Sequence, residues 1–557
     1  DFDSFFDSKK NYKQLLNRTL RIPDLVEKKF FKLYKNFYKY KWNIFNDFIY
    51  PIKTCYDQLF YYTFCLNRII TKYKIKTIYV RYNYKIKFTK DFVMDEKQSV
   101  LYSLLKSYKK KIKIKAINKS STLKESSIDN FILNKVKNKI KYFLFEKLIF
   151  KKKITSKNNN IISLSSHETD PLILKFPKLK KEIISLRHFE NILTNKNSKK
   201  QNNNFIKTLK KDSNIKKFFF INNFDVTSIF ILQISNILLS IENIYKKFKF
   251  YFSFINKQNT KLIIFSSMAP FEHQNIIFNK ISQLKKIPKV TWCHGGYCSI
   301  NLPGYDINDF KSCHNHFSYG SYLKEITENK NFLPSKIFKK KYQSFNIGSA
   351  NINLRFNSKN KNSKKKIIFI RGGVNTYNQF YFPITRKDAV KSFFPLTEKI
   401  LNILGKYQFK YEIIFKNYPK AKDNFFWKSY LAEKNLENIK YVSDEQSLEN
   451  MLDDNQVIIL PWLSTTFFQS LPFKNEIFLY DESAYDKHFK KCKNEINFFK
   501  NEDNFLNSLN DFLPKFDNIN FKHHKKTLKY FLNNNKINNI KDNFDSAVKK
   551  IIRSNYI

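Results

Sequence analysis

The chain has 557 residues, which at roughly 100–200 residues per domain allows about three to four domain-sized units. Hydrophobic residues make up 42% and aromatic residues 17% of the sequence, which excludes wholesale disorder, while 8 Gly and 14 Pro exclude collagen-like and linker-like classes. Six Cys are too few for a disulfide scaffold in a chain of this length, so we expect reduced thiols in a cytosolic setting.

The charge is strongly positive, with 102 Lys and Arg against 47 Asp and Glu and a formal net charge of +55. That balance alone suggests a nucleic-acid-binding protein. However, only nine of the cations are Arg, and the Lys are spread along the whole chain. Proteins that read DNA bases favour Arg, because its guanidinium can make two hydrogen bonds to one base. The excess of Lys, Asn, Ile, Phe and Tyr, all encoded by A/T-rich triplets, indicates a biased genome. We therefore expect no nucleic-acid partner, while the charge favours nucleotide-sugars or the anionic inner face of a membrane.

No run reaches the ~18 consecutive apolar residues of a transmembrane helix. The best candidate, 228–241, is short and interrupted by Gln and Asn, so it predicts a buried helix. The first residues, DFDSFFDSKK, lack the basic-then-apolar pattern of a signal peptide. The expected location is cytoplasmic, with peripheral contact to the inner face of the plasma membrane left open.

Helical periodicity comes first along the chain, and Pro51 suits the first turn of a helix. A strand–helix–strand pattern follows and predicts a parallel α/β unit. Ser/Asn/Lys-rich stretches then predict loops. The expected elements are helices at 26–48, 51–74 and 99–108, strands at 76–83 and 111–117, and loops at 119–128, 155–160 and 196–205.

Two further α/β stretches follow, separated by the polar, low-complexity segment 356–366, which we interpret as a linker. The first stretch predicts helices at 227–247 and 273–286 and strands at 261–267, 289–297 and 316–323, the last running into a helix. The second predicts strands at 366–373, 410–419 and 476–481, a helix at 388–405, a strand–turn–helix at 457–473 and mainly helices over 500–557.

This pattern predicts an α/β fold of two Rossmann-like, doubly wound domains that face a cleft, with a helical N-terminal extension. The expected parts are a helical N-terminal region (1–75), an N-terminal Rossmann-like domain with insertions (76–355), the linker (356–366), a C-terminal Rossmann-like domain (367–515) and C-terminal helices (516–557).

A histidine and two glycines follow the strand that begins at residue 289. Gly295 and Gly296 allow a tight turn and a close approach of the backbone to a ligand. His294 stands at the carboxyl end of that strand, where a histidine can act as a general base or donate a hydrogen bond to a phosphate. A plain turn beside a solvent-facing histidine is the alternative.

Three strand ends of the second stretch predict an anion site. Arg371, followed by Gly372 and Gly373, combines a guanidinium with free backbone N–H groups, and Lys416 would face the same cleft. Hydroxyl groups at a strand-to-helix junction can bind an anion or simply cap the helix. The residues of this junction are Ser464, Thr465, Thr466 and Gln469, with Asp481 on the next strand as a further polar or capping group.

A zinc site is the competing interpretation. Six residues that could bind zinc lie within 24 positions: Cys293, His294, Cys298, Cys313, His314 and His316. Cys293 nevertheless falls in an apolar strand pattern, where Cys is commonly a small core residue. We therefore expect no metal and no cofactor.

The order of these motifs resembles that of GT-B-type bacterial surface-carbohydrate (capsule and O-antigen) transferases. The resemblance rests on K-V-T-W-C-H-G-G-Y, Asp306, H-F-S-Y-G-S and I-G-S at 347–349, and on K-N-Y-P and S-T-T-F-F-Q where the family has K-x-H-P and S-T-T-x-x-E. The segment Y-K-W-N-I-F-N-D-F-I-Y-P also resembles the aromatic N-terminal region of transferases from spirochaete-type surface-polysaccharide clusters.

The resemblance implies a metal-independent glycosyltransferase. The N-terminal domain would bind a glycan or lipid-linked glycan acceptor, with His294 as the base, and the C-terminal domain a nucleotide-sugar. Tyr418 and Gln469 replace the usual His and Glu, and Gln binds a hydroxyl without charge assistance. The alternatives are a polyol-phosphate transferase and a non-catalytic binding or scaffold protein of a polysaccharide assembly complex.

Overall fold

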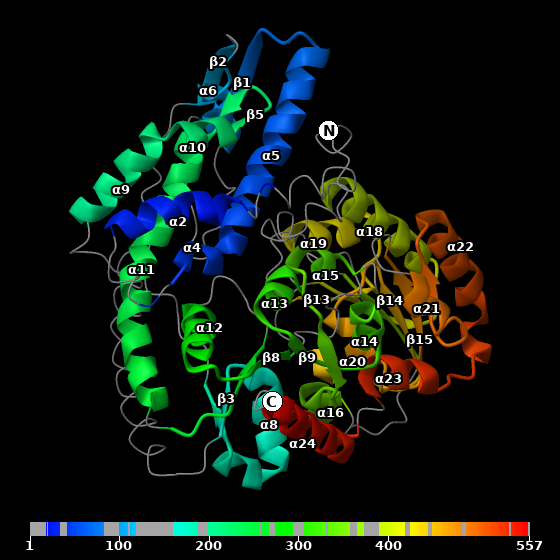
Figure 1. Cartoon of the computed structure of the whole chain (residues 1–557). Helices are drawn as coiled ribbons and strands as arrows, with labels where there is room; N and C mark the ends of the chain where they lie inside the picture. Colours follow the sequence, from blue (N-terminus) through cyan, green and yellow to red (C-terminus); the bar gives the residue numbers. More distant parts are fainter. Residues whose placement is uncertain are drawn as a thin grey trace, which may run out of the picture.

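The computed structural model describes residues 18, 21–33, 40, 42–82, 100–109, 112–118, 160–186, 199–256, 258–266, 273–292, 306–329, 332–356, 365–371, 389–417, 424–443, 448–481, 486–533 and 536–554. These residues form two six-stranded sheets flanked by helices, and a helical module at one end of the molecule (Figure 1). No helix among them is both long and apolar enough to cross a membrane.

The N-terminal sheet is entirely parallel and has the strand order β10-β9-β8-β7-β3-β4. Its strands are β3 (Ile161–Ser163), β4 (Ile183–Ser185), β7 (Leu262–Phe265), β8 (Lys289–Trp292), β9 (Asn315–Ser318) and β10 (Gln343–Asn346). Its helices are α8 (Ser166–Lys175), η2 (Pro177–Lys181), α12 (His273–Lys285), α13 (Asp306–Ser312), α14 (Tyr322–Thr327), α15 (Leu333–Phe338) and α16 (Ala350–Phe356). All four residues of β7 are buried, as expected of a strand that is covered on both faces.

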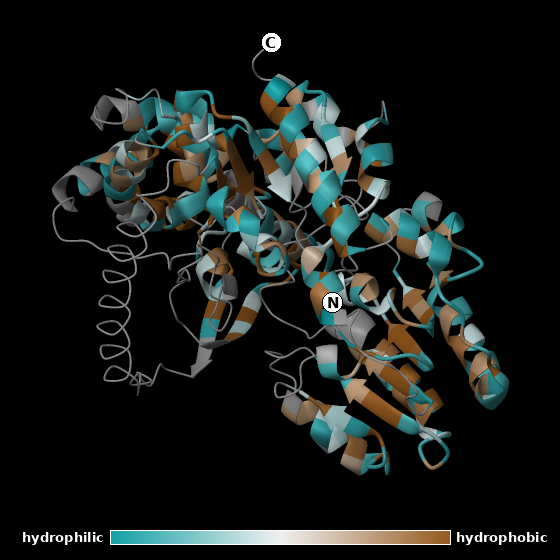
Figure 2. Ribbon diagram, turned by 90° about the horizontal axis from the view of Figure 1, so that it is seen from below, coloured by the Kyte–Doolittle hydropathy of each residue, from teal (hydrophilic) through white to brown (hydrophobic). Residues whose placement is uncertain are grey.

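The C-terminal sheet is also parallel, with the order β13-β12-β11-β14-β15-β16. Its strands are β11 (Lys366–Ile370), β12 (Glu412–Lys416), β13 (Lys440–Val442), β14 (Gln456–Leu460), β15 (Asn475–Tyr480) and β16 (Asn497–Phe499). Its helices are α18 (Ala389–Gly405), α19 (Asn424–Glu433), η3 (Leu448–Asn450), α20 (Thr465–Ser470), α21 (Asp486–Lys490), α22 (Glu502–Phe512) and η4 (Leu513–Asn518). Hydrophobic strands lie inside both domains, under helices whose outer faces are hydrophilic (Figure 2).

The predicted fold class is therefore confirmed: the chain contains two Rossmann-like, doubly wound α/β domains. Numbered in chain order, the C-terminal sheet has the arrangement 3-2-1-4-5-6 and the N-terminal sheet 2-1-3-4-5-6. Both orders are those of doubly wound nucleotide-binding folds. The linker predicted at 356–366 falls mostly outside the described residues, and β11 begins at its last residue. The domain boundaries themselves remain a prediction.

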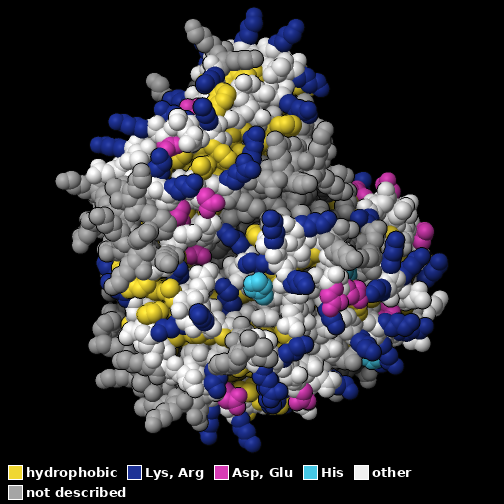
Figure 3. All heavy atoms as spheres, viewed as in Figure 1, with side chains coloured by type: hydrophobic (Ala, Val, Ile, Leu, Met, Phe, Trp, Pro, Cys, Tyr) yellow, Lys and Arg dark blue, Asp and Glu magenta, His cyan; other side chains and the backbone are white. Residues whose placement is uncertain are grey.

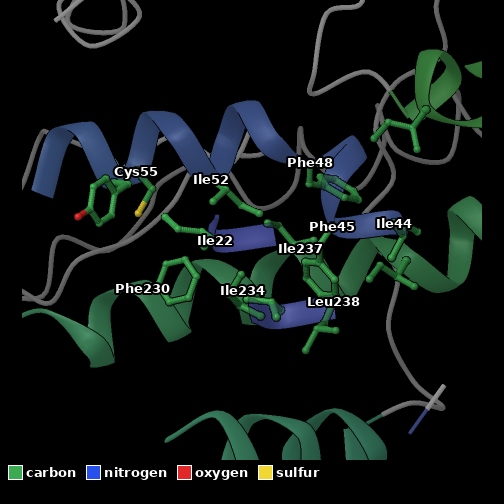
Figure 4. Packing of buried hydrophobic residues seen from close by; sticks show 14 of the residues in the cluster. Ile22, Ile44, Phe45, Phe48, Ile52, Cys55, Phe230, Ile234, Ile237 and Leu238 are labelled. Atoms are coloured by element: carbon green, nitrogen blue, oxygen red, sulfur yellow. The ribbon is translucent and has the colours of Figure 1, made fainter. Parts of the chain in front are cut away.

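The helical module combines the N-terminal segments with an insertion between β4 and β7. It consists of α2 (Ile22–Leu33), α4 (Ile44–Asp47), α5 (Ile49–Lys72), β1 (Thr77–Tyr82), α6 (Val100–Lys106), β2 (Lys113–Asn118), α9 (Lys199–Lys211), α10 (Ser213–Phe218), β5 (Phe220–Ile221), β6 (Phe224–Asp225) and α11 (Thr227–Asn256). Its core joins Phe45 and Ile52 to Phe230 and Ile237 of α11 (Figure 4). Within the described residues, β1 and β2 pair in parallel with each other and with neither six-stranded sheet.

One predicted loop is wrong. The stretch 196–205 reads as an exposed loop in the sequence, but α9 begins at Lys199. Phe205 and Leu209 are fully buried on one face of α9, and Phe205 packs against Phe30 of α2 at 5.7 Å. The apolar face is buried by tertiary contacts, and this packing outweighs the polar composition of the segment.

The last helices, α23 (Lys525–Leu532) and α24 (Ile537–Ser554), return from the C-terminal domain to the N-terminal sheet (Figure 1). Phe544 of α24 lies 5.7 Å from Trp292 and 5.8 Å from Phe317, which belong to β8 and β9. The end of the chain therefore connects the C-terminal domain to the N-terminal sheet.

Candidate functional site

The carboxyl end of the C-terminal sheet contains the point at which the strand order reverses, between β11 and β14. Open α/β sheets bind ligands in the crevice outside such a switch point. Arg371 follows β11 directly, and the turn that leads to Ser464 follows β14. The structure therefore brings two of the predicted anion-binding segments to the two sides of the switch point.

Arg371 is buried, with 1% of its surface exposed. Its Nε donates to the Thr397 hydroxyl at 2.9 Å and its Nη1 to the Asn417 side-chain oxygen at 3.3 Å. The guanidinium carbon lies 5.1 Å from the ring centre of Phe394 and 4.8 Å from that of Trp427. In this geometry the guanidinium braces α18 against the ends of β11 and β12.

Lys416 and Asn417 end the neighbouring strand. The backbone carbonyl of Lys416 accepts a hydrogen bond from the Arg371 N–H at 2.9 Å, and the Lys416 ammonium donates to the backbone carbonyl of Ser443. Asn417 donates from its side chain to the Tyr441 hydroxyl at 3.2 Å. Arg371 and Lys416 lie at the same edge of the sheet, because Lys416 is in register with Ile370. Lys416 is 5% exposed, so both side chains lie largely beneath the surface.

The turn after β14 carries the hydroxyl cluster. Helix α20 begins at Thr465, and Ser464 has an extended backbone with no hydrogen bond from its side chain to the first turn. Ser464, Thr465, Thr466 and Gln469 are all half-buried, so each retains exposed surface. The Asp481 carboxylate accepts a hydrogen bond from the Leu463 N–H at 3.0 Å. Asp481 thus fixes the turn that presents the hydroxyls.

At the facing edge of the N-terminal sheet, a buried carboxyl group joins three segments. Glu168 lies in the first turn of α8, just after β3, and is completely buried. Its Oε1 accepts from the hydroxyls of Tyr319 at 2.6 Å and Ser349 at 2.8 Å, and its Oε2 accepts from the Asn351 N–H at 3.2 Å. Burial raises the pKa of Glu168 to about 7, against the lowering effect of these hydrogen bonds.

The carboxyl edges of the N-terminal and C-terminal sheets meet next to the Glu168 network. Tyr319, which binds Glu168, also packs edge-to-face on Phe468 of α20, with ring centres 6.1 Å apart. The next residue, Gly320, approaches α23 so closely that a Cβ atom would lie 2.0 Å from the Tyr530 carbonyl oxygen. The Ser321 N–H donates to that same oxygen at 2.9 Å. The Glu168 network therefore lies one side chain away from the helix that carries the hydroxyl cluster.

Some predicted site residues lie outside the described residues. They are His294, Gly295, Gly296, Gly372, Gly373 and Tyr418, the residue that differs from the family motif K-x-H-P. The described part of β8 ends at Trp292, two residues before His294. The roles predicted for these residues remain predictions.

Of the six residues that could bind zinc in the alternative interpretation, Cys313, His314 and His316 lie in the described part of the chain, and each is buried or has another contact. Cys313 and His316 are buried, and the His316 Nδ1 lies 2.6 Å from the Thr291 hydroxyl. His314 lies with its Nδ1 3.3 Å from the Lys341 carbonyl oxygen. Across the described ranges, no group of three or more His, Cys, Asp or Glu could hold a metal ion.

No family model and no curated protein matches this sequence. Among solved structures, the chain is similar to a UDP-GlcNAc 2-epimerase from Neisseria meningitidis bound to UDP-GlcNAc, with 12% identity and a TM-score of 0.36. The alignment covers 70% of this chain and 98% of the epimerase chain. The assignment of the fold rests on the strand orders described above.

Sequence reasoning did not identify Glu168. The segment I-I-S-L-S-S-H-E-T-D does contain a signal, because a short apolar strand is followed by small polar residues and an acid within one helical turn. The local sequence does not identify the partners of Glu168, because Tyr319 and Ser349 stand 151 and 181 positions away.

Proposed function

We propose that this chain binds a nucleotide-sugar at the carboxyl edge of its C-terminal sheet and transfers the sugar to a surface-polysaccharide acceptor. The observation that carries the proposal is the 3-2-1-4-5-6 strand order, with Arg371 and the Ser464–Thr466 turn on either side of the switch point. Nucleotides bind to sheets of this order at that crevice. The resemblance of the motifs to GT-B transferases supports the choice of a nucleotide-sugar.

The donor would bind through its diphosphate. Ser464 and Thr466 stand in the turn after β14, next to the switch point, and would supply their hydroxyls and nearby backbone N–H groups, while Gln469 can accept from or donate to a ribose hydroxyl. Arg371 and Lys416 contribute positive charge from beneath this edge. We assign Arg371 a positioning role, since its guanidinium orients Asn417 and Thr397.

In the transfer step, the acceptor hydroxyl oxygen forms a bond to the anomeric carbon of the donor. The bond between that carbon and the diphosphate oxygen breaks, and the nucleotide leaves with the electron pair. His294 would take the proton of the acceptor hydroxyl. The positive edge would stabilise the negative charge that develops on the leaving group, without a metal ion.

A calorimetric screen with UDP-, GDP-, CMP- and CDP-sugars tests the donor site. We expect one nucleotide class to bind, and Ser464→Ala combined with Thr466→Val to weaken its binding by about 25-fold, because two hydrogen bonds of roughly 1 kcal/mol each are lost. Thr208→Val, at an exposed hydroxyl on α9, is the matched control and should leave the affinity unchanged. Absence of binding by every nucleotide would refute the donor site.

A non-catalytic binding or scaffold role is the second candidate. The burial of Arg371 between Phe394 and Trp427 favours it, as does Gln469 in place of a charge-assisted Glu. His294→Ala separates the two candidates once a donor is known. An enzyme loses donor turnover but keeps nucleotide affinity, whereas a scaffold binds its ligand without turnover in both forms.

A further inference from the structure

The outer face of the β1–β2 pair is exposed at the far end of the helical module (Figure 1). Side chains alternate between the faces of a strand, and here Ile78, Val80 and Ile114 pack on the core of the module. On the opposite face, Tyr79 of β1 is 61% exposed and is paired in register with Lys115 of β2, which is also exposed. The pair therefore presents an aromatic and cationic face to its surroundings.

Three exposed aromatic residues in this region each lie under a lysine. The ammonium of Lys115 is 5.5 Å from the ring centre of Tyr79, and that of Lys72 is 5.4 Å from the ring centre of Tyr73. The ammonium of Lys109 lies 4.2 Å from the ring centre of Phe220 on β5. Tyr73 is 60% exposed and Phe220 38% exposed. We call the surface formed by these six residues the tip.

Backbone hydrogen bonds connect the segments of the tip. The Lys113 N–H donates to the Lys76 carbonyl at 2.9 Å, which joins β2 to the segment after α5. The Lys109 N–H donates to the Asn223 carbonyl at 3.0 Å, which joins the end of α6 to the β5–β6 hairpin. The rings and cations are thus parts of one surface, and Figure 3 shows Lys and Arg gathered with hydrophobic side chains over this end.

The tip also differs from the rest of the chain in its charge pattern. Residues 72–82 and 100–118 contain ten Lys and Arg and no Asp or Glu, although the chain has 47 acidic residues. Asp225, on the adjoining hairpin, accepts a hydrogen bond from the Thr227 N–H at 3.2 Å. A strongly cationic surface with exposed tyrosines has the chemistry of a membrane-interface site, where aromatic rings lie at the level of the headgroups.

We propose that the tip docks on the surface of an anionic lipid bilayer. Lysines near such a surface are attracted by its negative potential, and the half-exposed rings can enter the headgroup region. Single-stranded nucleic acid fits less well, because each of the three rings already has a lysine over one face and the tip is poor in Arg. The docking is independent of the proposed donor site, which lies in a different domain.

Sedimentation of the full chain with vesicles tests the proposal. At about 150 mM salt, the protein should pellet with phosphatidylcholine vesicles that contain ~30% phosphatidylglycerol and stay in solution with phosphatidylcholine alone. Lys109→Gln combined with Lys115→Gln should lower the partition coefficient by roughly 30-fold, at about 5-fold for each charge. Tyr79→Ser should weaken binding further.

Matched variants make the test specific. Lys434→Gln combined with Lys440→Gln removes the same charge from exposed positions of the C-terminal domain, and Phe409→Ser removes an aromatic residue that is 86% exposed. Neither should change the partition coefficient more than about twofold. An equal loss in these controls, or no pelleting of the wild type, overturns the proposal. So does a double variant that keeps vesicle binding but loses affinity for a single-stranded RNA oligonucleotide at the same salt.

Vesicle pelleting needs no nucleotide, and nucleotide calorimetry needs no vesicle. Failure of one experiment therefore leaves the other proposal standing. Unfolding midpoints of all variants should match that of the wild type, since exposed substitutions of this kind rarely change stability by more than about 0.5 kcal/mol.

Discussion

The carboxyl group of Glu168 shows how one buried side chain can organise the edge of a sheet. It accepts hydrogen bonds from residues that follow β9 and β10 while standing itself after β3, so three strand ends share one acceptor. Because the carboxyl group is removed from water, its protonated form is stabilised relative to its ionised form. The position of Tyr319, and through it the contact with Phe468, depends on this carboxyl group.

The pKa of Glu168 predicts a pH dependence of stability. A carboxyl group whose pKa rises from 4.5 to about 7 on folding binds its proton more tightly in the native state. Its contribution is complete below about pH 4.5 and is lost as the pH rises through about 7, by roughly 3 kcal/mol in total. Glu168→Gln cannot ionise, so urea denaturation at pH 4 and pH 8 should show a smaller loss for the variant than for the wild type.

Other groups titrate in the same range, among them Glu27, whose pKa burial raises to about 8. The informative quantity is therefore the difference between wild type and Glu168→Gln at each pH. Equal pH dependence in the two proteins would show that the Glu168 carboxyl does not ionise in this range.

Arg371 yields a prediction about stability as well as about ligands. Removal of its side chain leaves the Thr397 and Asn417 oxygens without their guanidinium donor and removes the cation between two rings. Arg371→Ala should lower the free energy of unfolding by about 3 kcal/mol, and Arg371→Lys should recover only part of it because an ammonium cannot make the same pair of bonds. Chemical denaturation without ligand measures this. A fully stable Arg371→Ala would contradict the positioning role.

At the scale of elements, the turn after β10 in the N-terminal sheet is shaped by α24, one of the helices that close the chain. The turn after β10 contains Gly348, with φ at +100°, a conformation that residues with a side chain rarely adopt. A Cβ atom at Gly348 would also lie 2.8 Å from Cγ1 of Ile540 in α24. The motif I-G-S at 347–349 is therefore a packing requirement between an N-terminal turn and a C-terminal helix.

Gly348→Ala should destabilise the protein by roughly 2 kcal/mol through backbone strain and overlap with Ile540. A double-mutant cycle separates the two effects. In an Ile540→Ala background, the same substitution should cost less, with the remainder due to φ. If the cost is the same in both backgrounds, the overlap with Ile540 plays no part.

For the whole molecule, the decisive feature is the return of α24 to the N-terminal sheet. Phe544 fills the space beside Trp292 and Phe317, so the C-terminal residues complete the core of the domain that the chain formed earlier. Phe544→Ala should lower the free energy of unfolding by about 3 kcal/mol, because it leaves a cavity between α24 and the N-terminal sheet. Trp fluorescence during denaturation reports the change, and Phe409→Ala, at an exposed ring, is the control that should show none.

The sequence by itself determined several central strands and their order along the chain, although not the interior strand β3, which has only three residues. The runs at 262–265, 367–370 and 457–460 are continuous and apolar, which is what strands buried on both faces require, and β7, β11 and β14 lie there. From these strands alone a parallel, doubly wound α/β fold follows. Edge strands such as β10 and β16 were missed because their residues are only half-buried and lack that signal.

Only the tertiary structure decided what each predicted residue does. It placed Arg371 under two aromatic rings, brought Glu168 to Tyr319 across 151 positions, and assigned β1 and β2 to a separate module. Burial and desolvation depend on which distant segments pack over a side chain, and no local pattern contains that information. The motifs thus mark the edge of the sheet on which chemistry can occur, whereas the environment of each charge arises from contacts that form only when the chain is folded.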